Sequence, residues 1–290
     1  MTARLALVAL DCSNTHVTLE AYVTKAAPPL SDAYYVRLFS PSARRERVTA
    51  VLACAGEIEA CVRDAREPAI AQLKLAWWQE EIDLLARGAP RHPVTTVLAQ
   101  SPPLASASAA WLDLIRAARR ELDPEPHVTV EALLKHCVEA AALHELFALV
   151  LDAGGATLEH ARALGAAIVN ARLIGSARHV AEHGKVELPL DLLATAGVQP
   201  EALLAEWPPP ALDLLARLGA QARAGLSGAI EAIPAAERHA LQPCLIMGAL
   251  QEARLAALAA HDYVQVNDTL QPLKRLWIAW RAAGKALRSD

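Results

Sequence analysis

The chain has 290 residues and a formal net charge of −4, which gives no electrostatic reason to expect binding to nucleic acid. Hydrophobic residues make up 54 % of the chain but aromatic residues only 4 %, so its apolar content is mainly Ala, Leu and Val. It contains no run of about 18 uninterrupted apolar residues, which predicts that no segment spans a membrane. Its five cysteines are odd in number and form no CxxC pair, as is typical of reduced thiols in a cytoplasmic protein.

Apolar residues recur at three- and four-residue spacing along most of the sequence, which predicts helices separated by prolines. The expected helices cover about 32–39, 44–64, 68–87, 104–122, 128–152, 157–182, 190–196, 208–231, 235–262 and 270–287. Because short turns join them, we expect one all-α bundle with a wide interior, formed by residues 31–290. Residues 1–30 are weakly patterned and are expected to form a separate N-terminal segment.

Several short segments carry a family resemblance through their order and spacing along residues 31–200. They are DAYY at 32–35, FSP at 39–41, RRE at 44–46, LAWWQEEI at 75–82, HPV at 92–94, LGAA at 164–167 and GKVELP at 184–189. Together they resemble the squalene/phytoene synthase superfamily, although none of them is specific alone. The resemblance implies a single isoprenoid-synthase-type helical bundle that encloses a central hydrophobic cavity.

The acidic motifs on which this family's catalysis depends are reduced in this chain. A head-to-head prenyl synthase ionises an allylic diphosphate, which leaves readily only when carboxylate-bound Mg²⁺ neutralises its charge. The family holds this Mg²⁺ with two aspartate-rich motifs on facing helices. Here the first motif falls on residues 59–63, where Glu59 is the only acid and Arg63 takes the place of a metal ligand. The second falls on residues 176–180 and contains no carboxylate, although Glu182 follows one turn later.

No shift of register restores the first motif, because no two adjacent acidic residues occur between residues 44 and 79. The remaining pattern resembles a branch of the superfamily that includes the mitochondrial assembly factors of respiratory complex I and bacterial relatives. In that branch the first motif reads as a Glu–aliphatic pair followed by a Val–basic–acid triplet. EI at residues 57–58 and VRD at residues 62–64 match this reading, as does WW at residues 77–78.

The resemblance leads to two functional hypotheses. The first is a non-catalytic protein that binds an isoprenoid or another lipid, or that assists the assembly of a respiratory membrane complex. The alternative is an active head-to-head prenyltransferase that condenses prenyl diphosphates. In it, Glu59 and Glu182, helped by Arg37 and Arg172, would handle the diphosphates with fewer metal ions. A purely structural scaffold is a third possibility and predicts a filled interior.

The candidate cavity or ligand-binding residues are those at positions similar to the family's opening helix and its two motifs. They are Tyr34, Arg37, Glu59, Arg63, Arg172, Ser176 and His179. We assign no catalytic residue, no metal ligand and no cofactor, and expect Mg²⁺ only under the prenyltransferase alternative. The expected partners are an isoprenoid or other lipid ligand, and a respiratory complex subunit or a membrane surface, with no nucleic acid. The expected location is cytoplasmic, with a peripheral position at the membrane left open.

Two further patterns have a structural interpretation beside a functional one. His179 to His183 spells HxxEH, which could bind Zn²⁺ if Glu252 supplied a third ligand, but which also suits a polar last turn before a Gly184 C-cap. The final predicted helix carries an apolar stripe, which more often docks onto the bundle than onto a membrane or partner. The stripe consists of Leu273, Leu276, Trp277 and Trp280. Trp77 and Trp78 are adjacent, so at least one of them should lie in the core.

Overall fold

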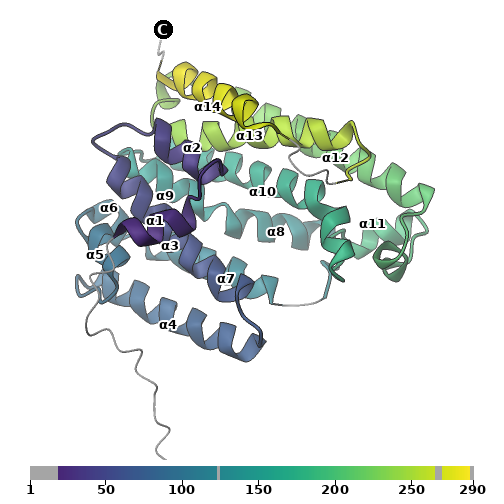
Figure 1. Ribbon diagram of the computed structural model, residues 1–290, viewed down its shortest axis with the longest axis horizontal. Coiled ribbons are helices and arrows are strands. Elements are labelled where there is room, and N and C mark those ends of the chain that lie inside the picture. Colours follow the sequence, from purple (N-terminus) through teal and green to yellow (C-terminus); the bar gives the residue numbers. More distant parts are fainter. Residues whose placement is uncertain (1–18, 123–124, 265–269, 288–290) are drawn as a thin grey trace, which may run out of the picture.

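The computed structural model describes residues 19–122, 125–264 and 270–287, and every regular element in these ranges is a helix (Figure 1). The expected all-α class is therefore confirmed. The α-helices are α1 (Leu19–Ala26), α2 (Asp32–Phe39), α3 (Arg45–Arg63), α4 (Pro68–Ala86), α5 (Pro93–Ala99), α6 (Pro102–Ala105), α7 (Ser108–Glu121), α8 (Val130–Ala140), α9 (Ala142–Val150), α10 (Ala156–Glu182), α11 (Leu190–Thr195), α12 (Pro209–Glu231), α13 (Gln242–Ala259) and α14 (Pro272–Leu287). Short 3₁₀ turns cover Pro200–Leu204 and Ala235–Glu237. Among the described helices, none combines the length and the apolar composition needed to cross a bilayer.

Helix α10 is the central element of the bundle. It is 27 residues long, rich in the strong helix former Ala and free of Pro, so it continues without a break. It contacts α8, α9, α12 and α13, and Figure 1 shows it crossing the middle of the molecule between these helices. Helix α3 organises the other half through contacts with α1, α4, α5, α7 and α9. Helices α3 and α10, which carry residues 59–63 and 176–180, thus each organise one half of the bundle.

Gly165 permits the close packing of α10 on the α8–α9 corner. A Cβ atom added at this position would lie 2.7 Å from Nδ1 of His144 and 3.0 Å from Cβ of Ala141. Any larger residue would therefore push α10 away from α9 or move the His144 ring, which is buried.

Some element boundaries differ from those expected. The range 128–152 contains two helices that meet at Ala141. Pro243 does not interrupt a helix but stands in the first turn of α13, where its missing N–H leaves no hydrogen bond unmade. Helix α1 lies within the weakly patterned segment 1–30 and packs on α3, while residues 1–18 of that segment lie outside the described residues.

The exposed fractions of the tryptophan side chains confirm one expectation and contradict another. Trp78 is buried and Trp77 is exposed, so one of the adjacent pair does lie in the core. The prediction that the apolar stripe of the last helix docks onto the bundle is wrong, because Trp277 and Trp280 are both exposed. The residues of α14 that are buried against the bundle are small instead: Ala279, Ala283 and Ala286.

Glu81 on α4 is a buried acid with a structural role. Its carboxylate accepts hydrogen bonds from the backbone N–H groups of Arg91 and His92, both at 2.8 Å, and from the Thr95 hydroxyl at 2.5 Å. Burial alone would raise the pKa of Glu81, but the hydrogen bonds from Thr95, His92 and Arg91 together lower it. The carboxylate therefore fastens the start of α5 to α4 as an anion.

We expect Glu81→Gln to destabilise the protein by about 2 kcal/mol, because the amide cannot satisfy the buried donors that the carboxylate accepts from. Since the folded-state pKa is lowered, this contribution is present above the unfolded-state pKa and is lost as the pH falls through the folded-state value. Urea unfolding at neutral and acidic pH measures both effects. Glu80→Gln, at the exposed neighbouring position, should change stability by less than about 0.5 kcal/mol; equal effects of the two variants would contradict the assigned role.

Candidate ligand-binding cavity

A cavity of about 240 Å³ lies in the interior of the bundle. Side chains from α2, α3, α7, α9, α10 and α13 line it, so segments far apart in the sequence share one space. Most of the lining is apolar and includes Leu52, Ile58, Leu114, Ile168, Val169 and Met247. Such a lining favours a hydrocarbon chain, whose burial stabilises a complex by roughly 0.8 kcal/mol per CH₂ group.

Glu59 from α3 and Arg172 from α10 face this cavity. The Glu59 side chain keeps accessible surface toward the cavity, but protein atoms surround its carboxyl and partly desolvate it. This burial raises the pKa of Glu59, while the charge of Arg172 acts in the opposite direction and the nearby carboxylate of Glu121 raises it further. The two walls thus present one carboxyl and one guanidinium group.

A second polar group lies where α2 meets α13. Arg254 donates to the Asp32 carboxylate and to the Gln251 side-chain oxygen, both at 2.8 Å. All three residues line the cavity. The ion pair joins residues 222 positions apart, so it ties the second helix of the chain to the C-terminal half of the bundle.

His144 is the most deeply buried polar group of the cavity lining. Its side chain is 2 % exposed, and neither ring nitrogen has a hydrogen-bond partner. Burial lowers the pKa of His144 to about 4, so the ring is neutral at physiological pH. A neutral imidazole with one free donor and one free acceptor can bind a hydroxyl or carbonyl group inside an apolar space.

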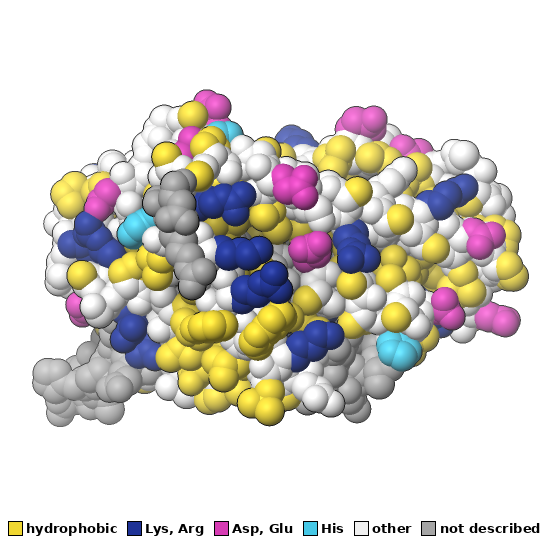
Figure 2. All heavy atoms as spheres, turned by 90° about the horizontal axis from the view of Figure 1, so that it is seen from above, with side chains coloured by type: hydrophobic (Ala, Val, Ile, Leu, Met, Phe, Trp, Pro, Cys, Tyr) yellow, Lys and Arg dark blue, Asp and Glu magenta, His cyan; other side chains and the backbone are white. Residues whose placement is uncertain are grey.

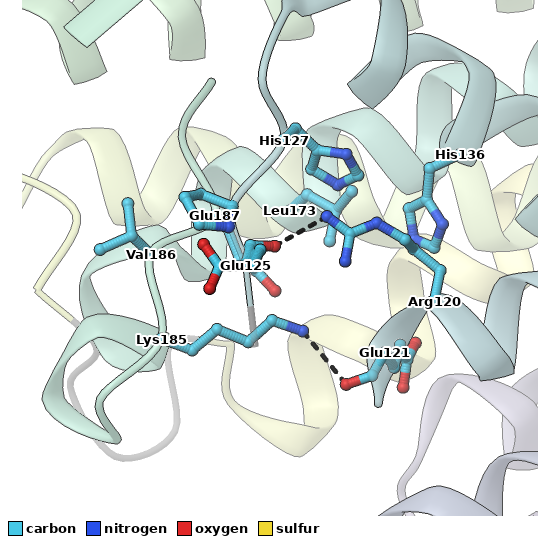
Figure 3. Close-up of a pocket in the computed structure, with 10 residues that line it drawn as sticks. Arg120, Glu121, Glu125, His127, His136, Leu173, Lys185, Val186 and Glu187 are labelled. Atoms are coloured by element: carbon cyan, nitrogen blue, oxygen red, sulfur yellow. Dashed lines mark hydrogen bonds between the residues drawn. The ribbon is translucent and has the colours of Figure 1, made fainter. Parts of the chain in front are cut away.

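A smaller polar pocket of about 30 Å³ adjoins the cavity and shares Glu121 with it (Figure 3). This volume is sufficient for water but not for an organic ligand. Lys185 donates to the Glu121 carbonyl oxygen at 3.3 Å, and Arg120 donates to the Glu125 carbonyl oxygen at 2.8 Å. Basic and acidic side chains are mixed here, and Figure 3 shows Lys185 and Arg120 reaching across the pocket from different segments.

Glu187 brings a carboxylate close to the second motif position from outside the helix. The Ser176 hydroxyl lies 3.4 Å from the Glu187 carboxylate and 2.9 Å from the Arg172 carbonyl oxygen. Burial raises the pKa of Glu187, while Lys185 and Arg172 act to lower it. Glu187 and Glu59 thus share the charged neighbours Arg172 and Glu121, and Lys185 acts in addition on Glu187.

The structure brings some of the predicted site residues together and separates others. Glu59 and Arg172 line the cavity, and Ser176 lies one turn from Arg172. The other five predicted residues, Ser176 included, are not part of the cavity lining. Tyr34 packs its ring against Tyr35, Arg37 donates to Thr49 at 3.2 Å, Arg63 pairs with Asp64 at 3.2 Å, and His179 lies 4.6 Å from the ring centre of His183.

The residues present do not fit the Mg²⁺ cluster of a prenyl synthase. Within the ranges that the structure describes, no three His, Cys, Asp or Glu side chains are grouped so that they could hold a metal ion. Helix α3 offers the cavity Glu59, and α10 offers Arg172, a cation that repels Mg²⁺. The HxxEH segment forms the polar last turn of α10, followed by Gly184 with a positive φ of 84°. Glu252 was the candidate third ligand for a Zn²⁺ ion at this segment. Its carboxylate instead accepts a hydrogen bond from the Ser227 hydroxyl at 3.0 Å.

Sequence reasoning missed several polar residues of the cavity and its surroundings. Asp32 and Glu187 stood inside the quoted DAYY and GKVELP segments, so a signal for them was present. No motif marks the others, whose roles depend on packing between distant helices. They are Glu121, His144, Gln251 and Arg254.

We expect His144 to make the protein less stable as the pH falls from about 6.5 to about 4, because the unfolded chain binds a proton there before the folded protein does. In the wild type this protonation should lower the free energy of unfolding by on the order of 3 kcal/mol, and His144→Gln should remove that acid-dependent loss. Chemical unfolding followed across this pH range measures the effect. His239→Gln, at an exposed position, should leave the pH profile unchanged, and an unchanged profile for His144→Gln as well would refute the assignment.

Glu59→Gln should increase stability at neutral pH, because burial raises the pKa of this carboxyl and its ionised form is therefore disfavoured in the folded protein. The stability that Glu59 contributes is complete below the unfolded-state pKa and is lost as the pH rises through the folded-state value. The advantage of the variant should accordingly disappear in acid. Glu57→Gln on the same helix breaks a 3.0 Å pair with Lys25 and should lower stability by up to about 1 kcal/mol. A loss of thermal stability for Glu59→Gln at neutral pH would contradict the proposed environment.

Comparison with known proteins agrees with this architecture. The structure is similar to a dehydrosqualene synthase in complex with ligand, with a TM-score of 0.73 and 15 % sequence identity over 92 % of this chain and 95 % of that one. It is also similar to squalene synthase HpnC from Alicyclobacillus acidocaldarius, with a TM-score of 0.69 and 16 % identity over 86 % of this chain and 95 % of that one. No curated protein sequence is similar enough to count as a match. The squalene/phytoene synthase family model matches residues 30–280, and the chain therefore belongs to the squalene/phytoene synthase family.

Proposed function

We propose that this protein binds a single neutral isoprenoid or similar lipid chain in the cavity and does not condense prenyl diphosphates. The observation that carries the proposal is the pair of walls formed by α3 and α10, which offer Glu59 and Arg172 in place of two clusters of carboxylates. Without clustered oxygen ligands there is no seat for Mg²⁺, and without Mg²⁺ a diphosphate is a poor leaving group.

The charge of the cavity lining supports a neutral ligand. Two arginines and three carboxylates face the space, and each arginine has an acidic neighbour: Arg254 pairs with Asp32, and Arg172 lies within electrostatic range of Glu59. The lining therefore has no surplus of positive charge to compensate the negative charge of a diphosphate. A hydroxyl or carbonyl head group could instead use the free nitrogens of His144.

The volume of the cavity supports one chain rather than two. Head-to-head condensation requires two prenyl diphosphates in the same site. The volume of this cavity, about 240 Å³, is below the ~300–1,000 Å³ of common small-molecule pockets. The lipid would be held by burial of its hydrocarbon against residues such as Leu114, Ile168 and Met247.

The alternative of an active prenyltransferase would need Glu182 and Arg37 to act at the cavity. Glu182 lines a different hollow together with Arg178 and Trp207, and Arg37 donates to Thr49 between α2 and α3. Neither residue is part of the cavity lining, which weighs against this alternative. The resemblance of residues 57–64 to the branch that includes complex I assembly factors supports the non-catalytic hypothesis, and with it a role in assembling a respiratory membrane complex.

We expect the purified protein to bind geranylgeraniol saturably and to release no diphosphate from geranylgeranyl diphosphate when Mg²⁺ is present. Binding is measured by titration calorimetry and by the rise in unfolding temperature with ligand concentration. Turnover is measured by release of labelled diphosphate and by extraction of hydrocarbon products. A squalene- or phytoene-like product would overturn the proposal.

The cavity is tested by filling it. Leu114→Trp introduces a large ring at a half-buried lining position and should weaken geranylgeraniol binding by about tenfold or more, as should Met247→Phe if Leu114→Trp folds poorly. Leu134→Trp, at an exposed position on α8, is the matched control and should bind as the wild type does. Unaltered binding in both cavity variants would place the ligand elsewhere and refute the assigned site.

A further inference from the structure

Helix α14 carries its large apolar side chains on the outside of the molecule. Leu273 is 79 % exposed, Trp280 60 % and Trp277 52 %, and Leu276 and Leu287 are exposed as well. At about 100° per residue these five positions share one face of the helix, and the buried alanines lie on the adjacent face. The helix therefore docks through its small residues and presents an apolar face, here called the α14 face, to the surroundings.

Positive charge lies along one edge of the α14 face. Lys274, Arg281 and Lys285 follow one another along this edge, and the Arg281 guanidinium lies 5.2 Å from the ring centre of Trp277. Helix α14 contains no acidic residue between Pro272 and Leu287. Figure 2 looks onto this side of the molecule and shows basic side chains bordering a group of hydrophobic ones.

The surface beside the α14 face extends the positive charge. A hollow of about 330 Å³ lies between α12, α13 and α14 and is lined by Arg223 and Arg238 as well as by Arg281 and Lys285. One acidic residue, Glu252, also lines this hollow, and its carboxylate accepts a hydrogen bond from the Ser227 hydroxyl. The exposed apolar side chains of the α14 face therefore lie next to several cationic groups.

We propose that the α14 face docks the protein onto an anionic lipid bilayer, with Trp277, Trp280 and Leu273 entering the interface and the basic edge contacting lipid phosphates. Exposed Trp and Leu on one side of a helix with Lys and Arg at its border are the residues that lie in a membrane interface. Each Lys or Arg near an anionic surface adds about 1 kcal/mol of attraction. This proposal does not depend on what the interior cavity binds.

The charge distribution disfavours a second copy of this chain as the occupant. In a two-fold symmetric dimer the same patch occurs on both partners, so Lys274, Arg281 and Lys285 would face an equally basic edge. An anionic bilayer, by contrast, complements the basic edge and the apolar face at the same time. Its fluid surface also requires no groove that fits the two projecting indole rings.

The test is co-sedimentation of the full-length protein with vesicles of phosphatidylcholine alone and of phosphatidylcholine mixed with phosphatidylglycerol. We expect binding to the mixed vesicles, weakened by high salt. The double variant Trp277→Ala/Trp280→Ala should weaken it by about tenfold or more, and so should Lys274→Glu/Lys285→Glu. Leu73→Ala removes an apolar side chain of 73 % exposure on α4 and should leave binding unchanged. All substitutions are at exposed positions, so the unfolding temperatures should stay similar.

Quenching by brominated lipids provides an independent readout, because it detects only indole rings that enter the bilayer. Wild-type fluorescence should be quenched in mixed vesicles, and the double tryptophan variant should lose that quenching. Absence of binding to mixed vesicles would overturn the proposal. Vesicle binding by the tryptophan variant as strong as that of Leu73→Ala would also overturn it. So would a dimer, detected by light scattering and dissociated by the tryptophan substitutions, in a protein that does not bind vesicles.

Discussion

Glu59 and Arg172 face one cavity from α3 and α10, so the two helices on which the sequence resemblance places acidic motifs offer this cavity one carboxyl and one guanidinium group. A carboxylate cluster would repel itself in the interior and would be stable only around bound cations. The charge of Arg172 acts on Glu59, so this pair needs no metal ion to offset its negative charge. Most of the cavity lining is accordingly apolar.

The same balance of charge recurs elsewhere in the bundle. Asp32 and Arg254 join α2 to α13, and Glu81 is satisfied by backbone N–H groups at the start of α5. The charges of Asp32, Arg254 and Glu81 are thus matched within the protein, as the desolvation cost of an unpaired ion requires. His144 is different, because it is neutral and its ring nitrogens have no partner. It therefore has hydrogen-bonding capacity inside the cavity that the proposed ligand could use.

The outside of the molecule shows a separate division of roles. Alanines hold α14 against the bundle, and the tryptophans and leucines of the same helix face outward beside basic residues. The proposed interior lipid site and the proposed bilayer-binding surface thus use different helix faces. A protein that both contains a lipid-sized cavity and rests on a bilayer would be close to the source of its ligand.

The sequence by itself determined the helical class, most helix positions and the loss of acids at residues 59–63 and 176–180, because periodicity, proline placement and residue identity are local properties. It also pointed to Glu59 and Arg172. Only the tertiary structure decided that His144, Glu121 and Arg254 share their space, and that the stripe of α14 faces outward. An amphipathic pattern reports that a helix has two faces, but which face is covered depends on the shape of the surface it meets. Here the bundle buries Ala279, Ala283 and Ala286 of α14, and the larger Leu273, Trp277 and Trp280 remain exposed.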